Sequence, residues 1–89
     1  MPSLAFTGNL QRHVACPPCE VEGATVREAL EGAFARYPAV RSYVSDEHGA
    51  VRHHVVIFLN GQAISDRQHQ SDPVDARGEI YVMQALSGG

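Results

Sequence analysis

The chain has 89 residues, of which 44% are apolar and 19% are charged, and its formal net charge at neutral pH is -3. This length suits one domain and leaves no room for a two-domain enzyme. The acidic balance excludes the basic surface of a typical nucleic-acid binder, and the longest apolar run, residues 55–59, is far shorter than the ~20 residues of a membrane-spanning helix. We therefore expect a cytoplasmic protein with neither nucleic acid nor membrane as a partner.

The first predicted elements are two short strands at residues 3–7 and 11–16, separated by a Gly-Asn turn signal. Cys16 and Cys19 then form a C-x-x-C motif that encloses two prolines. A redox pair would place its first cysteine at the start of a helix, and a structural zinc site would need four ligands, of which only His13 lies near. We therefore expect an incidental stiff loop, with redox and metal binding as the alternatives.

One helix is predicted from Thr25 to Tyr37. Thr25 and Glu28 have the spacing of a capping box, in which the threonine hydroxyl accepts from a first-turn amide and the glutamate reaches back to the cap amide. Apolar residues then recur with the period of a single buried helical face. They are Val26, Ala29, Leu30, Ala33, Phe34 and Tyr37. Pro38 is expected to end the helix, because it cannot donate the next backbone hydrogen bond.

Three more strands are expected after the helix. Residues 55–59 and 62–64 flank Asn60 and Gly61, a pair typical of a type I′ hairpin turn, and a last strand is expected at residues 79–86. The resulting order is β-β-α-β-β-β, which predicts an α+β fold with a mixed sheet of four to five strands and one main helix on one face.

Both faces of this sheet would be apolar, although one helix covers only one of them. Residues alternate between the two faces of a strand, so the apolar set that does not contact the helix points outward. We expect this outer set to bind a partner protein. It comprises Val56, Phe58, Tyr81 and Met83. The alternative is that loops at residues 40–50 and 65–77 cover part of this face.

The end of the sequence is the predicted chemical site. We expect residues 1–86 to form the domain and residues 87–89 to form a flexible Ser-Gly-Gly arm. Gly88 and Gly89 lack a Cβ atom, so the arm could enter a slot too narrow for any side chain. An ionised α-carboxylate at Gly89 is a poor electrophile and must be activated by another enzyme. Arm and carboxylate together indicate a carrier protein and not an enzyme.

Several segments resemble the ThiS/MoaD family of ubiquitin-like sulfur carriers. They are residues 23–30 at the helix start, residues 55–61, and residues 78–82 leading to Gly88 and Gly89, while residues 46–54 resemble the CysO-like branch. The resemblance implies a ubiquitin-like β-grasp whose arm, with Leu86 and Ser87, contacts its partners. Two positions depart from the family pattern: the family often has an acidic residue in place of Gly78, and often a proline near Gln84. Both positions are expected on the partner-facing end, so the identity of the sulfur acceptor stays open.

The resemblance also implies a reaction cycle. A ubiquitin-activating-type adenylating enzyme would use ATP and magnesium to adenylate Gly89, and a sulfur donor (persulfide or sulfide) would convert it to a thiocarboxylate. An acceptor synthase subunit would then take the sulfur for molybdopterin, the thiazole of thiamine or cysteine. For molybdopterin synthase the chain would be the small subunit. No cofactor is expected to stay bound.

The alternative function is that of a ubiquitin-like modifier joined through Gly89 to lysines of other proteins. All seven basic residues other than histidine are arginines, so this chain has no lysine to accept its own carboxylate. The histidines give no metal prediction: His53 and His54 would point to opposite faces of a strand, and His48 and His69 lie in turn-rich sequence.

Overall fold

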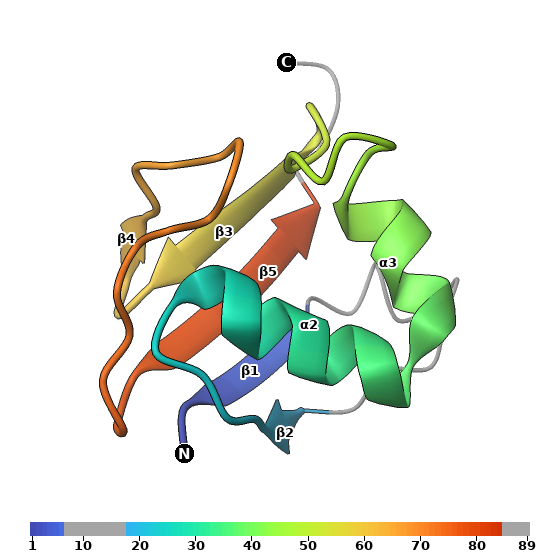
Figure 1. Cartoon of the computed structure of the whole chain (residues 1–89). Helices are drawn as coiled ribbons and strands as arrows, with labels where there is room; N and C mark the ends of the chain where they lie inside the picture. The colour runs from blue at the N-terminus through green and yellow to red at the C-terminus, as the bar shows by residue number, and fades with distance from the viewer. Residues whose placement is uncertain (7–17, 85–89) are drawn as a thin grey trace.

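The computed structural model describes residues 1–6 and 18–84 (Figure 1). Its elements are β1 (Ser3–Phe6), β2 (Cys19–Glu20), α2 (Val26–Arg36), α3 (Pro38–Val44), β3 (Val55–Leu59), β4 (Gln62–Ala63) and β5 (Glu79–Gln84). The strand predicted at residues 11–16 lies outside the described residues. Cys19 was expected in a loop, and this is wrong: it pairs with Leu4 in an antiparallel ladder.

The strands form one five-stranded sheet in the order β2-β1-β5-β3-β4. β5, the last described element, occupies the centre: it runs parallel to β1 and antiparallel to β3. α2 lies across one face of this sheet, and α3 follows it beside the strands (Figure 1). The α+β fold and its ubiquitin-like β-grasp topology are thereby confirmed.

The start of α2 is held by side chains and by a distant loop. The amide of Glu28 donates to Oγ1 of Thr25 at 3.2 Å, as the capping box predicts. The amides of Val26 and Arg27 donate to carbonyls of residues 65–72, at 3.0 and 2.9 Å. Hydrogen-bond donors that a helix terminus normally leaves free are thus satisfied within the chain.

The second half of the capping box differs by one residue from the prediction. Oε1 of Glu28 accepts from the amide of Ala24 at 2.9 Å, whereas the sequence predicted the amide of Thr25. The carboxylate of Glu28 still satisfies a free amide, and its negative charge lies beside the positive end of the helix dipole. The helix therefore begins where the sequence predicts, with a shifted partner.

Pro38 both ends α2 and starts α3. Proline fits the first turn of a helix because the amide it lacks has no partner there. The expectation of a loop at residues 40–50 is therefore wrong for its first part. Val40 and Val44 of α3 are fully buried and belong to the same core as the inner face of the sheet.

The core lies between the sheet and the two helices. Along each strand the inner residues alternate with outer ones, so that Val55 and Ile57 are fully buried whereas Val56 and Phe58 are half-buried. The buried strand residues are Leu4, Phe6, Val55, Ile57, Ile80 and Val82. This settles which apolar set faces the helices and leaves the other on the outer face.

Candidate functional site

The outer face of the sheet brings together the predicted partner-binding residues of β3 and β5. In the antiparallel register Val56 lies opposite Met83 and Phe58 lies opposite Tyr81. Tyr81 is 43% exposed and the other three are half-buried. We name these four residues the outer patch. Their shared face is as expected, and their binding role stays a prediction.

A hollow lies on this outer face. Ala5 is the neighbour of Tyr81 on β1, and its small side chain leaves space beside the aromatic ring. The lining comes from strands and from the hairpin turn, and includes no residue of segments 40–50 or 65–77. It consists of Ser3, Ala5, Phe58, Asn60, Gly61, Glu79, Ile80, Tyr81 and Met83. At this hollow, therefore, neither segment covers the outer face, whereas the alternative expectation had them cover part of it.

The hairpin turn at one end of the hollow is the type I′ turn that the sequence predicts. Asn60 and Gly61 have φ values of 52° and 86°, the left-handed conformations that this turn requires. The amide of Asn60 donates to the carbonyl of Glu79 at 2.8 Å, and Oδ1 of Asn60 accepts from the amide of Glu79 at 2.9 Å. These two bonds fix the beginning of β5 against the turn.

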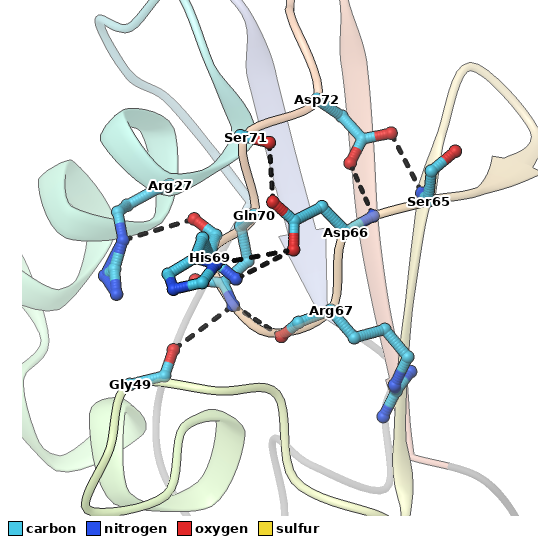
Figure 2. Close-up of polar contacts among 9 residues, drawn as sticks. All are labelled: Arg27, Gly49, Ser65, Asp66, Arg67, His69, Gln70, Ser71 and Asp72. Carbon is cyan, nitrogen blue, oxygen red and sulfur yellow. Dashed lines mark hydrogen bonds and ion pairs between the residues drawn. The ribbon is translucent and has the colours of Figure 1, made fainter.

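A polar network organises the segment 65–72, and sequence reasoning missed it (Figure 2). The carboxylate of Asp72 accepts from the amides of Ser65 and Asp66, both at 2.9 Å. These hydrogen bonds, first that of Ser65 and then that of Asp66, lower the pKa of Asp72. Asp66 in turn accepts from the hydroxyl of Ser71 at 2.6 Å, which, with the amide of His69, lowers the pKa of Asp66.

Gln70 connects this segment to two other parts of the chain. Its side chain is 2% exposed, and its Nε2 donates to the carbonyl of Arg67 at 2.7 Å and to that of Gly49 at 3.2 Å (Figure 2). Arg27 of α2 donates from Nε to the carbonyl of His69 at 3.2 Å. The network therefore holds segment 65–72 against the helix side of the molecule and has a structural role.

The remaining candidate side chains stay apart. His53 and His54 lie in a turn and not on a strand, and both are exposed. Cys19 is half-buried with a free thiol, and Cys16 lies outside the described residues. Within residues 1–6 and 18–84, no three His, Cys, Asp or Glu side chains gather as a metal site. No helix in those ranges is both long and apolar enough to cross a membrane.

The predicted arm lies outside the described residues. Leu86, Ser87, Gly88 and Gly89 all follow Gln84, where the description of β5 ends. Gly78, immediately before β5, is buried, and a Cβ atom there would meet a methyl group of Val74 and lie 3.2 Å from the carbonyl oxygen of Asp75. Its departure from the family pattern is thus explained by packing, and the expectation that this position lies on a partner-facing end stays a prediction.

Comparison with known protein families gives one match. The model of the ThiS family matches residues 16–89, most of the chain and the whole of its last part. No curated protein matches the sequence.

Solved structures share the fold along the full chain. Small archaeal modifier protein 1 of Haloferax volcanii is 26% identical, with a TM-score of 0.78 over 99% of this chain and 98% of that one. CysO in the BexX/CysO complex of Amycolatopsis orientalis is 17% identical, with a TM-score of 0.84 over 100% of both chains. CysO of Mycobacterium tuberculosis is 13% identical, with a TM-score of 0.81 over 97% of this chain and 100% of that one.

Proposed function

Because the chain belongs to the ThiS family, we propose that it is a sulfur carrier whose Gly89 carboxylate is converted to a thiocarboxylate. At the level of the family it is a ubiquitin-like sulfur carrier or modifier. The observation that carries the proposal is the family match, which extends through Gly88 and Gly89, two residues that follow β5, the central strand of the sheet, in the sequence. Its role is that of a substrate protein, on which other enzymes act.

The proposed chemistry proceeds at the carboxylate of Gly89. An oxygen of the carboxylate attacks the α-phosphorus of ATP on the adenylating enzyme, and pyrophosphate leaves with magnesium. Sulfide can then attack the acyl carbon and displace AMP. A persulfide donor instead attacks the acyl carbon with its outer sulfur and displaces AMP, which gives an acyl disulfide. A second thiol then attacks the donor's own sulfur, so that the thiocarboxylate leaves and the donor and the thiol form a disulfide. An acceptor synthase subunit takes the sulfur for molybdopterin, thiazole or cysteine synthesis.

Two features of the chain suit it to this role. The outer patch offers an adenylating enzyme an apolar surface next to the end of β5, from which the chain continues toward Leu86 and Ser87. The pair Gly88 and Gly89 presents no side chain, so a narrow channel can admit it. Docking and chemistry are thereby assigned to separate parts of the protein.

The direct test is the intact mass of the protein after incubation with its adenylating enzyme, ATP, magnesium and a sulfur source. We expect a mass increase of one oxygen-to-sulfur exchange, located on the C-terminal peptide. Formation of the product should need ATP and should be absent when the enzyme is left out. An unchanged mass under conditions in which the enzyme binds the protein would refute the proposal.

Gly89→Ala tests the steric requirement of the arm. The added Cβ should meet the wall of the channel, so we expect thiocarboxylate formation to fall by at least about tenfold while the fold is retained. Gly32→Ala is the matched control, because a Cβ there would lie 3.4 Å from Val21, near an ordinary contact distance. Equal product from both variants would contradict the steric argument.

Conjugation to other proteins is the second candidate function, and the similarity to small archaeal modifier protein 1 favours it. It would make Gly89 an acyl donor to lysine amines. Because this sequence has no lysine, each modified lysine should carry a single copy and no lysine-linked chain. Immunoblots of a lysate with tagged protein and ATP should then show Gly89-dependent adducts, and their absence removes this candidate.

A further inference from the structure

The outer face of the sheet is polar and acidic at one end. Glu79 begins β5, and the parallel register places Ser3 of β1 beside it. On its other side stands Asn60 of the hairpin turn, which is bonded to the Glu79 backbone. All three line the hollow.

The opposite end of the same face is apolar. Proceeding along β5, Tyr81 lies between Ala5 and Phe58, and Met83 then lies opposite Val56. Along β5 the outer face therefore changes from the carboxylate of Glu79, through the rings of Tyr81 and Phe58, to the apolar pair Met83 and Val56. The apolar end is the one nearest the point where the chain leaves the sheet toward Gly89.

Among residues 1–6 and 18–84, the carboxylate of Glu79 has no ion-pair partner and can receive a cation. Its residue is exposed, and no described arginine or histidine lies within ion-pair distance of it. Glu31, by contrast, forms a two-pronged pair with Arg41, with oxygen-nitrogen distances of 2.6 and 3.0 Å. Glu79 thus differs from a glutamate already neutralised within the protein.

The backbone that carries Glu79 is fixed before any partner arrives. Its amide and its carbonyl are both bonded to Asn60, at 2.9 and 2.8 Å, and the strand continues into the centre of the sheet. Binding therefore needs to order only the side chain of Glu79 and not its backbone, which reduces the entropy cost. Together, a free carboxylate and an adjoining hollow make a directional binding surface.

We propose that Glu79 binds an arginine or lysine of the adenylating enzyme while the apolar end of the face binds apolar side chains of that enzyme. This inference rests on the proposed function. Glu79 and Met83 are four residues apart on one strand, about 13 Å at 3.3 Å per residue. The enzyme's cation should therefore lie about that far from its apolar contact. These two unlike contacts fix the orientation of docking. Only one direction brings the enzyme's cation to Glu79 and its apolar side chains to the apolar end at the same time.

The test compares two glutamine substitutions by calorimetric binding to the adenylating enzyme. Glu79→Gln removes the charge on the outer face, and Glu22→Gln removes an exposed charge from the loop before α2. We expect Glu79→Gln to weaken binding about tenfold and Glu22→Gln to change it by less than about twofold. Thermal unfolding should be alike for both variants, since neither carboxylate has a described ion pair to lose.

Salt dependence gives a second readout. Affinity of the wild-type protein should fall between about 0.05 and 0.5 M salt, and this fall should be smaller for Glu79→Gln than for Glu22→Gln. Glu79→Asp, which keeps the charge, should recover part of the affinity. Equal affinities and equal salt dependence for the two glutamine variants would overturn the inference.

The same experiment separates this inference from the proposed function. If the wild-type protein binds the enzyme but forms no thiocarboxylate, the sulfur-carrier proposal fails and the two glutamine variants still decide the role of Glu79. If the thiocarboxylate forms and both variants bind alike, only the inference about Glu79 fails. If the wild-type protein does not bind the enzyme, the inference is refuted as well.

Discussion

Gln70 combines a buried amide side chain with a left-handed backbone, a φ of 51°. Residues other than glycine rarely adopt this conformation unless their surroundings hold them there. Here its amide donates to Asp66 at 2.8 Å, its carbonyl accepts from Arg27, and its side chain reaches Gly49 and Arg67. A polar residue in a turn-rich stretch gave no sign of this, because its partners come from distant parts of the chain.

Gln70→Ala should lower the free energy of unfolding by about 2 kcal/mol. The substitution removes the side-chain donor to the carbonyl of Gly49 and one of two donors to that of Arg67, which still accepts from the amide of Val51 at 2.9 Å. An unpaired buried polar group costs about 1–3 kcal/mol. Urea unfolding followed by circular dichroism measures the change. Gln62→Ala, at an exposed position of β4, is the control and should change stability little. Equal effects of the two substitutions would mean that the network adds no stability.

At the scale of single elements, α2 shows how far local signals reach. The position of Thr25, the period of the apolar residues and the break at Pro38 fix its bounds closely, because all three act within a few residues. Even so, the carbonyls that accept from Val26 and Arg27 could not be predicted, because they belong to segment 65–72, which is distant from the helix in the sequence.

Thr25→Ala should destabilise the protein by about 1 kcal/mol, because the amide of Glu28 loses the hydroxyl that accepts its hydrogen bond. Thr25→Ser keeps a hydroxyl and should lie within about 0.5 kcal/mol of the wild type. The midpoints of urea unfolding provide the comparison. Alanine and serine variants of equal stability would show that water replaces the cap at no cost.

α3 and β2 were missed for different reasons. Pro38 was taken only as a helix stop, although proline also suits the first turn of a helix, and the spacing of Val40 and Val44 is one helical turn. The two residues of β2 carry no strand pattern of their own. Their pairing with β1 is set by the fold, as is the bond from the amide of Val21 to the carbonyl of Pro2 at 2.9 Å.

For the whole molecule, the alternation of strand residues predicted the outer patch correctly, because the two faces of a strand are fixed by geometry. The hollow was not predictable, since it depends on Ala5 of β1 lying beside Tyr81 of β5, a pairing between the two ends of the chain. Local pattern thus predicts which side of a strand a residue occupies. Neighbours across the sheet follow only from topology.

Acid should destabilise the folded protein as a whole. Amide donors, those of His48 and then Ala50, lower the pKa of Asp46, and the pKa values of Asp66 and Asp72 are lowered by the network described above. A carboxyl whose pKa is lower when folded than when unfolded stabilises the fold above its unfolded pKa of about 3.9. That stabilisation is lost as the pH falls through the folded-state pKa values.

The free energy of unfolding should therefore stay nearly level from about pH 7 to 5 and decrease steadily below about pH 4. Urea titrations at several pH values measure this profile. Asp72→Asn should be less stable at neutral pH and show a shallower acid decrease, whereas Glu47→Gln, an exposed change, should follow the wild type. An Asp72→Asn profile as steep as that of the wild type would contradict the conclusion that protonation of Asp72 contributes to the loss of stability in acid.

The central place of β5 has a mechanical consequence. Hydrogen bonds to β1 and β3 hold this strand along both edges. An enzyme that grips the chain beyond Gln84 and draws it inward would pull along the strand axis, so the load would be shared in shear among many bonds at once. A strand at the edge of the sheet would share the same load among the bonds to one neighbour only. The protein can thus be pulled at the segment beyond Gln84 while its domain stays folded.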